Sequence, residues 1–262
     1  DGNRQASAFT RRGQAFEREG LYDRAIEEYT RAILIDPSSA EAHLGRGWAH
    51  MAKGNHDQAI RNYGEAIGLD PSLAEAHFAR GWAYEKLGKN DRAIEEYGEA
   101  IRVAPGHGEA RFSRGILRFY SDQPEPAAGD FSAIVEGSGD GLHAYALLWL
   151  YLSRARAGGE ADRELRTHAG RLDLGPWPGI IVKMYLGQAQ AAQVIAASRD
   201  SDERKQRENE CVAFFFLGQE RLVKGDREMA AEYFQKTLDT GITGYRQYAA
   251  AREELRKLGR FN

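Results

Sequence analysis

The residues of this sequence best suited to metal binding or nucleophilic catalysis are its seven histidines and its one cysteine. His43 and His50 lie seven residues apart, on one face of a predicted helix, but no carboxylate or cysteine stands beside them at the spacing of a metal site. His77 repeats the position of His43, which favours half-buried packing residues over metal ligands. Cys211 stands in an apolar segment and is expected to be buried in a helix. We therefore expect neither a metal nor a cofactor.

Catalytic motifs are also missing from the sequence. It contains no glycine-rich phosphate loop, no nucleophile elbow and no His-Glu-x-x-His pattern. The paired carboxylates Glu27-Glu28 and Glu95-Glu96 precede tyrosines on predicted helices and are expected to be solvated. These observations predict a protein that is not an enzyme.

Small and aromatic residues recur instead with a period of 34, a spacing typical of a helix–turn–helix solenoid. Glycines between the helices of each pair and a proline after each pair mark the turns, because glycine readily takes positive φ and proline interrupts a helix. The recurring positions are Ala8, Ala42, Ala76 and Ala110; Gly13, Gly47, Gly81 and Gly115; Tyr29, Tyr63, Tyr97 and Phe131; and Pro37, Pro71 and Pro105. A glycine inside a helix lowers stability by about 1 kcal/mol relative to alanine. We therefore expect the glycines inside the first helices to permit a close approach of the second helices, with Ala25, Ala59 and Ala93 as their partners.

These offsets resemble the tetratricopeptide repeat (TPR). The resemblance implies an all-α fold, a right-handed superhelix of about fourteen to fifteen helices. The expected organisation is an N-terminal tail (1–5), three regular repeats (6–39, 40–73 and 74–107), a degenerate repeat (108–141), an irregular helical segment (142–199), a TPR-like repeat (200–241) and a capping helix (242–262). In the degenerate repeat Asp122 replaces the turn glycine, and Pro124 and Pro126 are expected to break the start of the second helix.

In TPR proteins the first helix of each repeat lines a concave groove. Mapping the family's groove positions onto this chain predicts a binding surface rich in aromatic side chains with an acidic rim. Repeat one contributes polar residues, including Gln14, Glu17 and Arg18. The predicted partner-binding residues are Leu44, Trp48, Met51, Phe78, Trp82, Phe112, Ile116 and Phe119, with Glu41, Glu75 and Glu109 on the rim.

Three occupants of this surface remain open: a partner peptide or protein, a second copy of the chain, and other parts of the same chain. The lysines and asparagines with which some TPR proteins hold a carboxylate-ended chaperone tail are absent. Their positions read Thr10, Gln14, Gly45, Glu75 and Ala79. We expect a protein-binding scaffold, with a structural homodimer or a regulatory subunit as the alternatives.

The second half resembles bacterial outer-membrane TPR lipoproteins of the NlpI type, on short aromatic patterns. These are residues 148–152 (LWLYL), Trp177 before Ile181-Val182, residues 185–187 (YLG) and residues 216–218 (FLG). The resemblance implies a homodimeric adaptor for cell-wall peptidases and a protease, in the periplasm or at the outer membrane. The single cysteine, Cys211, rules out an internal disulfide framework, which is also compatible with the cytoplasm as the alternative location.

Composition further limits the classes of partner and of segment that we expect. The formal net charge of −3 argues against nucleic acid, whose binders carry a strongly basic face. No apolar run approaches the ~18 residues of a membrane helix, so no transmembrane segment is expected.

Overall fold

The computed structural model describes residues 2–137 and 142–260, and within these ranges it contains fifteen helices and no strand. The chain divides into two compact units, residues 1–123 and 124–262. The first unit consists of α1 (Gly2–Arg18), α2 (Tyr22–Ile35), α3 (Ala40–Ala52), α4 (His56–Leu69), α5 (Ala74–Lys86), α6 (Asn90–Val103) and α7 (Gly108–Tyr120). The all-helical fold predicted from the 34-residue period is confirmed.

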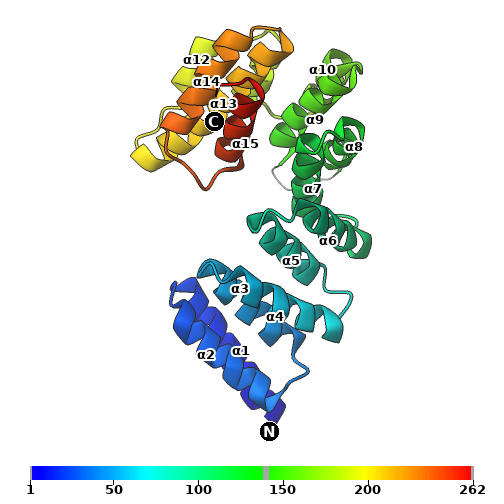
Figure 1. The fold of residues 1–262 in the computed structure, drawn as a ribbon, viewed down its shortest axis with the longest axis vertical. Helices are drawn as coiled ribbons and strands as arrows, with labels where there is room; N and C mark the ends of the chain where they lie inside the picture. The colour runs from blue at the N-terminus through cyan, green and yellow to red at the C-terminus, as the bar shows by residue number, and fades with distance from the viewer. Residues whose placement is uncertain (1, 138–141, 261–262) are drawn as a thin grey trace. The chain divides into compact units, whose positions relative to one another are not determined.

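In the first unit, consecutive helices pack as pairs and each pair packs on the next (Figure 1). Helix α1 packs on α2, α3 on α4 and α5 on α6, while the first helices α1, α3 and α5 also contact one another in sequence. The turns within the pairs place Gly20, Gly54 and Gly88 at φ values of 74°, 76° and 70°. This left-handed conformation is the one that glycine adopts without strain.

The glycines inside the first helices make room for tyrosine rings. A Cβ added at Gly13 would lie 2.8 Å from the Tyr29 ring, and one at Gly47 would lie 2.5 Å from the Tyr63 ring. The prediction named alanines such as Ala25 as the partners, whereas the nearest atoms belong to the tyrosines. A planar ring needs a gap in the helix surface that only a residue without Cβ provides.

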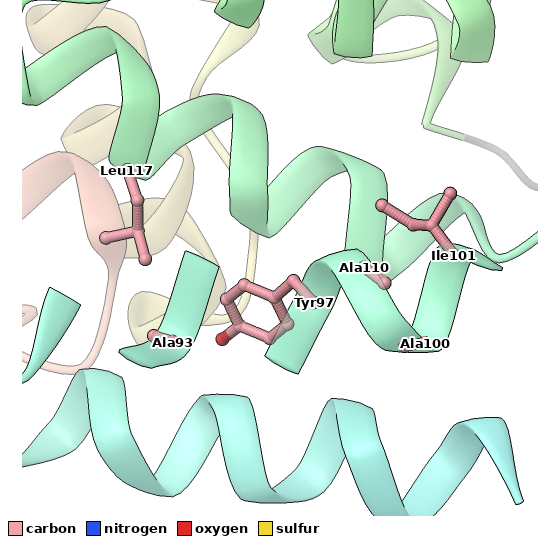
Figure 2. Packing of buried hydrophobic residues seen from close by; sticks show 6 residues of the cluster. All are labelled: Ala93, Tyr97, Ala100, Ile101, Ala110 and Leu117. Atoms are coloured by element: carbon pink, nitrogen blue, oxygen red, sulfur yellow. The ribbon is translucent and has the colours of Figure 1, made fainter. Parts of the chain in front are cut away.

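The core of the third repeat shows the same packing. Tyr97 lies between Ala93 on its own helix and residues of α7, and it is fully buried (Figure 2). Ala110 and Leu117 of α7 belong to the same cluster, so one ring joins two helix pairs. Burial of a large aromatic side chain stabilises the fold by about 2–3 kcal/mol.

Arginines of the first helices bind acceptors on the second helices 16 residues later. Arg12 Nε donates to Glu28 Oε2 at 2.7 Å, and Arg80 Nη2 donates to Glu96 Oε1 at 2.6 Å. Glu28 is buried and Glu96 is partly buried, so the prediction that the paired glutamates are solvated is wrong for the second member of each pair. Glu27 and Glu95, their neighbours in sequence, are exposed. The paired arginine offsets the cost of burying each carboxylate.

The second unit is built around the longer helix α13 (Glu203–Val223) and α9 (His143–Ala157). Trp149 of α9 is 1% exposed and packs against Phe215 and Phe216 of α13. The remaining helices are α8 (Pro124–Val135), α10 (Ala161–Ala169), α11 (Gly179–Tyr185), α12 (Ala191–Ala197), α14 (Arg227–Asp239) and α15 (Arg246–Lys257). Helix α15 packs on α13 and α14.

Some details differ from the sequence-based expectations. Residues 2–5, expected as a tail, form the start of α1, and Asp1 lies outside the described residues. Pro124 and Pro126 do not break α8 but occupy its first turn, where no intrahelical N–H bond is required. Asp122 takes the place of the turn glycine with φ at 58°. The unit boundary falls after Gln123, inside the expected degenerate repeat, whose last residues 138–141 are not described.

Cys211 is fully buried, as expected, and burial raises the pKa of its thiol to about 11. No helix in the described ranges combines the length and the apolar character required to cross a membrane.

Candidate functional site

The first helices of the first unit carry the predicted binding residues, which differ in exposure. The hydrophobic residues that reach the surface in part are Leu44, Trp48, Phe78, Trp82 and Phe112, and the exposed acidic residues are Glu41, Glu75 and Glu109. We call these eight residues the first-helix face. Three other predicted residues are buried: Met51 at 5% exposure, Ile116 at 6% and Phe119 at 1%. These three side chains belong to the core, because the helices beside them cover their positions.

Two tryptophans lie at the centre of the first-helix face. The rings of Trp48 and Trp82 are 5.6 Å apart at a tilt of 44°, and Trp48 also makes an edge contact of 5.7 Å with Tyr63. The Lys86 ammonium lies 5.6 Å from the centre of the Trp82 ring. The tryptophans thus rest on the core with one side and reach the surface with the other.

Phe78 extends this aromatic surface towards α7. Its ring lies 5.7 Å from Tyr97 and 5.0 Å from His107. The His107 Nε2 atom is in turn 3.8 Å from Oε2 of Glu75 on the rim. His107 therefore contacts both an aromatic ring and a carboxylate of the first-helix face.

A pocket of about 470 Å³ opens between α1 and α3. Gly45 lines it and leaves room for the Tyr29 ring, because a Cβ at residue 45 would lie 2.5 Å from that ring. The corresponding interval between α3 and α5 has Ala79 at that position, and the two tryptophans occupy the surface above it. The pocket is lined by Gln14, Glu17, Arg18, Tyr29, Glu41, Leu44, Gly45 and Trp48.

Hydrogen bonds hold the two carboxylates of this pocket in place. The Tyr29 hydroxyl donates to Glu17 Oε2 at 2.8 Å, and Gln14 Nε2 donates to Glu41 Oε1 at 2.9 Å. Burial raises the pKa of Glu17 above its usual value, although the Tyr29 hydrogen bond and the Arg18 charge act in the opposite direction. Burial likewise raises the pKa of Tyr29, and the negative charges of Glu17 and Glu41 add to that rise. Both carboxylates in the pocket lining are therefore oriented by protein hydrogen bonds.

Tyr63 differs from its counterparts in the neighbouring repeats. Glu17 and Glu85 accept hydrogen bonds from Tyr29 and Tyr97, but Met51 stands at the equivalent position beside Tyr63. The Tyr63 hydroxyl is buried and has no hydrogen-bond partner among the described residues. Burial raises the pKa of Tyr63, with further contributions from the charges of Glu17 and Glu75.

The histidines make packing contacts rather than converging on one site. His43 is 7% exposed with Nε2 at 3.3 Å from the Pro37 carbonyl, and His77 is 6% exposed with Nδ1 at 3.1 Å from Glu96 Oε2. Burial lowers the pKa of His43 and of His50. Within residues 2–137 and 142–260, no group of three or more His, Cys, Asp or Glu side chains could hold a metal ion.

The sequence-based mapping missed Tyr29 and Gly45 as parts of the pocket. Tyr29 lies on a second helix, whereas the mapping considered first helices only. A usable signal was present in the sequence, because glycine occurs at residue 45 but alanine and serine occur at the equivalent residues 79 and 113.

Two protein-family models match residues of the first unit. The model described as "TPR repeat" matches residues 13–54 and 49–88, and that described as "Tetratricopeptide repeat" matches residues 74–107. The chain therefore carries tetratricopeptide repeats over residues 13–107. No curated protein sequence gives a significant match.

Solved structures extend the likeness in fold to the whole chain. A tetratricopeptide repeat protein from Parabacteroides merdae is 19% identical, with 97% of this chain and 99% of that chain covered and a TM-score of 0.60. A MamA protein is 21% identical, with 64% of this chain and 91% of that chain covered and a TM-score of 0.56. The likeness at these identities shows a helical fold of the TPR type.

Proposed function

We propose that this protein is a non-catalytic scaffold that binds a segment of a partner protein on the first-helix face. The observation that carries the proposal is the half-buried pair Trp48 and Trp82, flanked by Leu44 and Phe78. Contiguous apolar side chains at a surface are typical of an interaction site, and tryptophan is enriched among the residues that dominate binding energies. The acidic rim favours basic residues in the bound segment.

The test uses a random dodecapeptide display library selected on the full chain. Binding of the selected peptides is then compared for Trp48→Ala, Trp82→Ala and the matched control Leu34→Ala, whose side chain on α2 is 77% exposed. Loss of a buried tryptophan contact costs about 2 kcal/mol, or roughly 30-fold in affinity. Circular dichroism and thermal unfolding establish whether each variant remains folded.

Two results would contradict this proposal. One is a library that yields no binder, and the other is a folded Trp48→Ala or Trp82→Ala variant that binds as tightly as the control. Loss of helicity in both variants, together with no selected peptide, would favour the reading in which these rings only pack internally.

The alternatives predict different measurements. A structural homodimer without a surface ligand predicts a dimer in sedimentation velocity and loss of that dimer in Trp82→Ala. A regulatory subunit predicts co-purification with a defined enzyme. The resemblance to NlpI-type lipoproteins motivates a narrower form of the scaffold proposal, an envelope adaptor for peptidases or proteases, which co-purification from bacterial envelope fractions would test.

A further inference from the structure

We propose that the α1–α3 pocket binds the cationic side chain of an arginine or lysine in the partner segment. This inference rests on the proposed function and assigns a specific subsite within it. The pocket lies beside Trp48, so a segment that covers the tryptophans can place a neighbouring side chain in it. Its volume of about 470 Å³ exceeds that of any single side chain, so it has room for a long one.

The pocket walls match the two parts of such a side chain. Leu44 and the Trp48 ring supply apolar surface for the methylene groups, and long cationic side chains bury their stems on such surface while the charged end meets polar groups. The ring can also attract a cation through its π face. The carboxylates of Glu17 and Glu41 also line the pocket, and Glu17 accepts the hydrogen bond of the Tyr29 hydroxyl.

These carboxylates are held in position before any ligand binds. Tyr29 fixes Glu17, and Gln14 fixes Glu41, so a bound cation orders little that is not already ordered. Each carboxylate oxygen retains acceptor capacity beyond its one protein hydrogen bond.

Arg18 is the opposing charge in the pocket lining. It is exposed and lines the pocket. The two carboxylates and this one guanidinium together give the pocket lining a formal net charge of −1. A cationic ligand would be repelled by Arg18, whereas an anionic ligand would be attracted to it. Removing this charge therefore changes the affinity in opposite directions for the two kinds of ligand.

The experiment uses the dodecapeptides selected from the display library. Each basic residue is replaced in turn, arginine by citrulline and lysine by norleucine, and affinities are measured by fluorescence anisotropy at pH 7.5. Replacing the basic residue at one peptide position is expected to weaken binding by about 10-fold. Raising the salt concentration is expected to reduce this difference in affinity between the parent and the replaced peptide.

Matched protein variants locate that position in the pocket. Glu17→Gln and Glu41→Gln keep an acceptor for Tyr29 and Gln14 but remove the charges, and each is expected to weaken binding by about 3- to 10-fold. Arg18→Gln is expected to strengthen it by about 3-fold. Glu27→Gln makes the same charge change at an exposed site on α2 and serves as the control. Stronger binding cannot result from mere structural damage.

The outcomes separate this inference from the function on which it rests. Peptides that need Trp48 but tolerate every citrulline and norleucine replacement would overturn the cationic subsite and leave the scaffold intact. Weaker binding in Arg18→Gln, or acidic residues enriched in the selected peptides, would overturn it as well. A library that yields no binder contradicts both proposals together.

Discussion

The Tyr29 hydroxyl donates a hydrogen bond of 2.8 Å to Glu17, and Tyr97 makes the equivalent bond of 2.7 Å to Glu85 two repeats later. The repeat between them has the same tyrosine, Tyr63, but Met51 replaces the glutamate. One chain therefore contains the same ring against a glycine of its own repeat, with and without a hydrogen-bond partner.

Removing these hydroxyl groups is expected to have opposite effects. Tyr29→Phe and Tyr97→Phe should each lower the free energy of unfolding by about 1–2 kcal/mol, because a half-buried carboxylate loses its donor. Tyr63→Phe should leave it unchanged or raise it by up to about 1 kcal/mol, because the buried hydroxyl has no partner among the described residues. Urea unfolding followed by circular dichroism measures all three. Equal losses in the three variants would contradict the assignment.

Alanine substitutions at two helical glycines distinguish the effect of helix propensity on stability from the effect of packing. Gly47→Ala should lower the free energy of unfolding by about 2 kcal/mol or more, because its Cβ would lie 2.5 Å from the Tyr63 ring. Gly68→Ala, in the exposed last turn of α4 with no atom within 4 Å of the new Cβ, should raise it by about 0.5–1 kcal/mol. Thermal unfolding of both variants measures the difference. A stabilising Gly47→Ala would show that the ring can move aside.

Adjacent glutamates on α2 give a similar test of the arginine bonds. Glu28→Ala should lower the free energy of unfolding by about 2–3 kcal/mol, because Arg12 and Arg31 both bind this buried carboxylate. Glu27→Ala, at an exposed position, should change it by less than about 0.5 kcal/mol. Chemical unfolding at low and high salt measures both, and equal effects would mean that the buried ion pair contributes little.

The periodic part of the fold could be predicted from sequence because the recurring residues report packing directly. The face of a helix follows from spacing, so the 34-residue period predicts that Trp48 and Trp82 lie next to each other, and their rings are 5.6 Å apart. Depth does not follow from spacing alone. Met51 and Phe119 occupy predicted groove positions, yet they are buried, because the size of the surrounding residues decides how far a side chain reaches the surface.

Other features needed the pairing of two helices to become visible. The sequence places arginine at residues 12, 46, 80 and 114 and a polar acceptor 16 residues after each, but either series alone is typical of a solvated helix face. Less of the packing of the irregular second unit could be predicted from sequence. Trp149 stands where the repeat would place glycine, and no period indicates which residues Trp149 contacts. Its contacts with Phe215 and Phe216 join segments far apart in sequence.

Mild acid should destabilise the first unit through two histidines. Burial lowers the pKa of His43 and of His50, and the Arg46 charge lowers both further. Below about pH 6.5 the unfolded chain therefore binds more protons than the folded chain, so the free energy of unfolding falls as the pH falls through that window. The double variant His43→Gln/His50→Gln should show a shallower loss between pH 7 and pH 5 in urea unfolding. Parallel curves for variant and parent would contradict this explanation.

The buried thiol should resist alkylation. Burial raises the pKa of Cys211 to about 11, so little thiolate is present at pH 8 and reagents have no direct access. Iodoacetamide should modify the native protein at least about 100-fold more slowly than the protein in concentrated urea, as followed by mass spectrometry. Similar rates would show that α13 opens readily.

Each tyrosine ring rests on a glycine of its own repeat, and Tyr29 also rests on Gly45 of the next. The packing between neighbouring repeats is thus determined by the residues of one 34-residue block and by the first helix of the block that follows. Copying residues 40–73 in the gene would place Tyr63 against a second Gly45, a smaller residue than the Ala79 that follows it now, so the duplicated joint would close without a clash. We therefore expect a duplicated block to pack at this contact, which would add one more indole to the first-helix face.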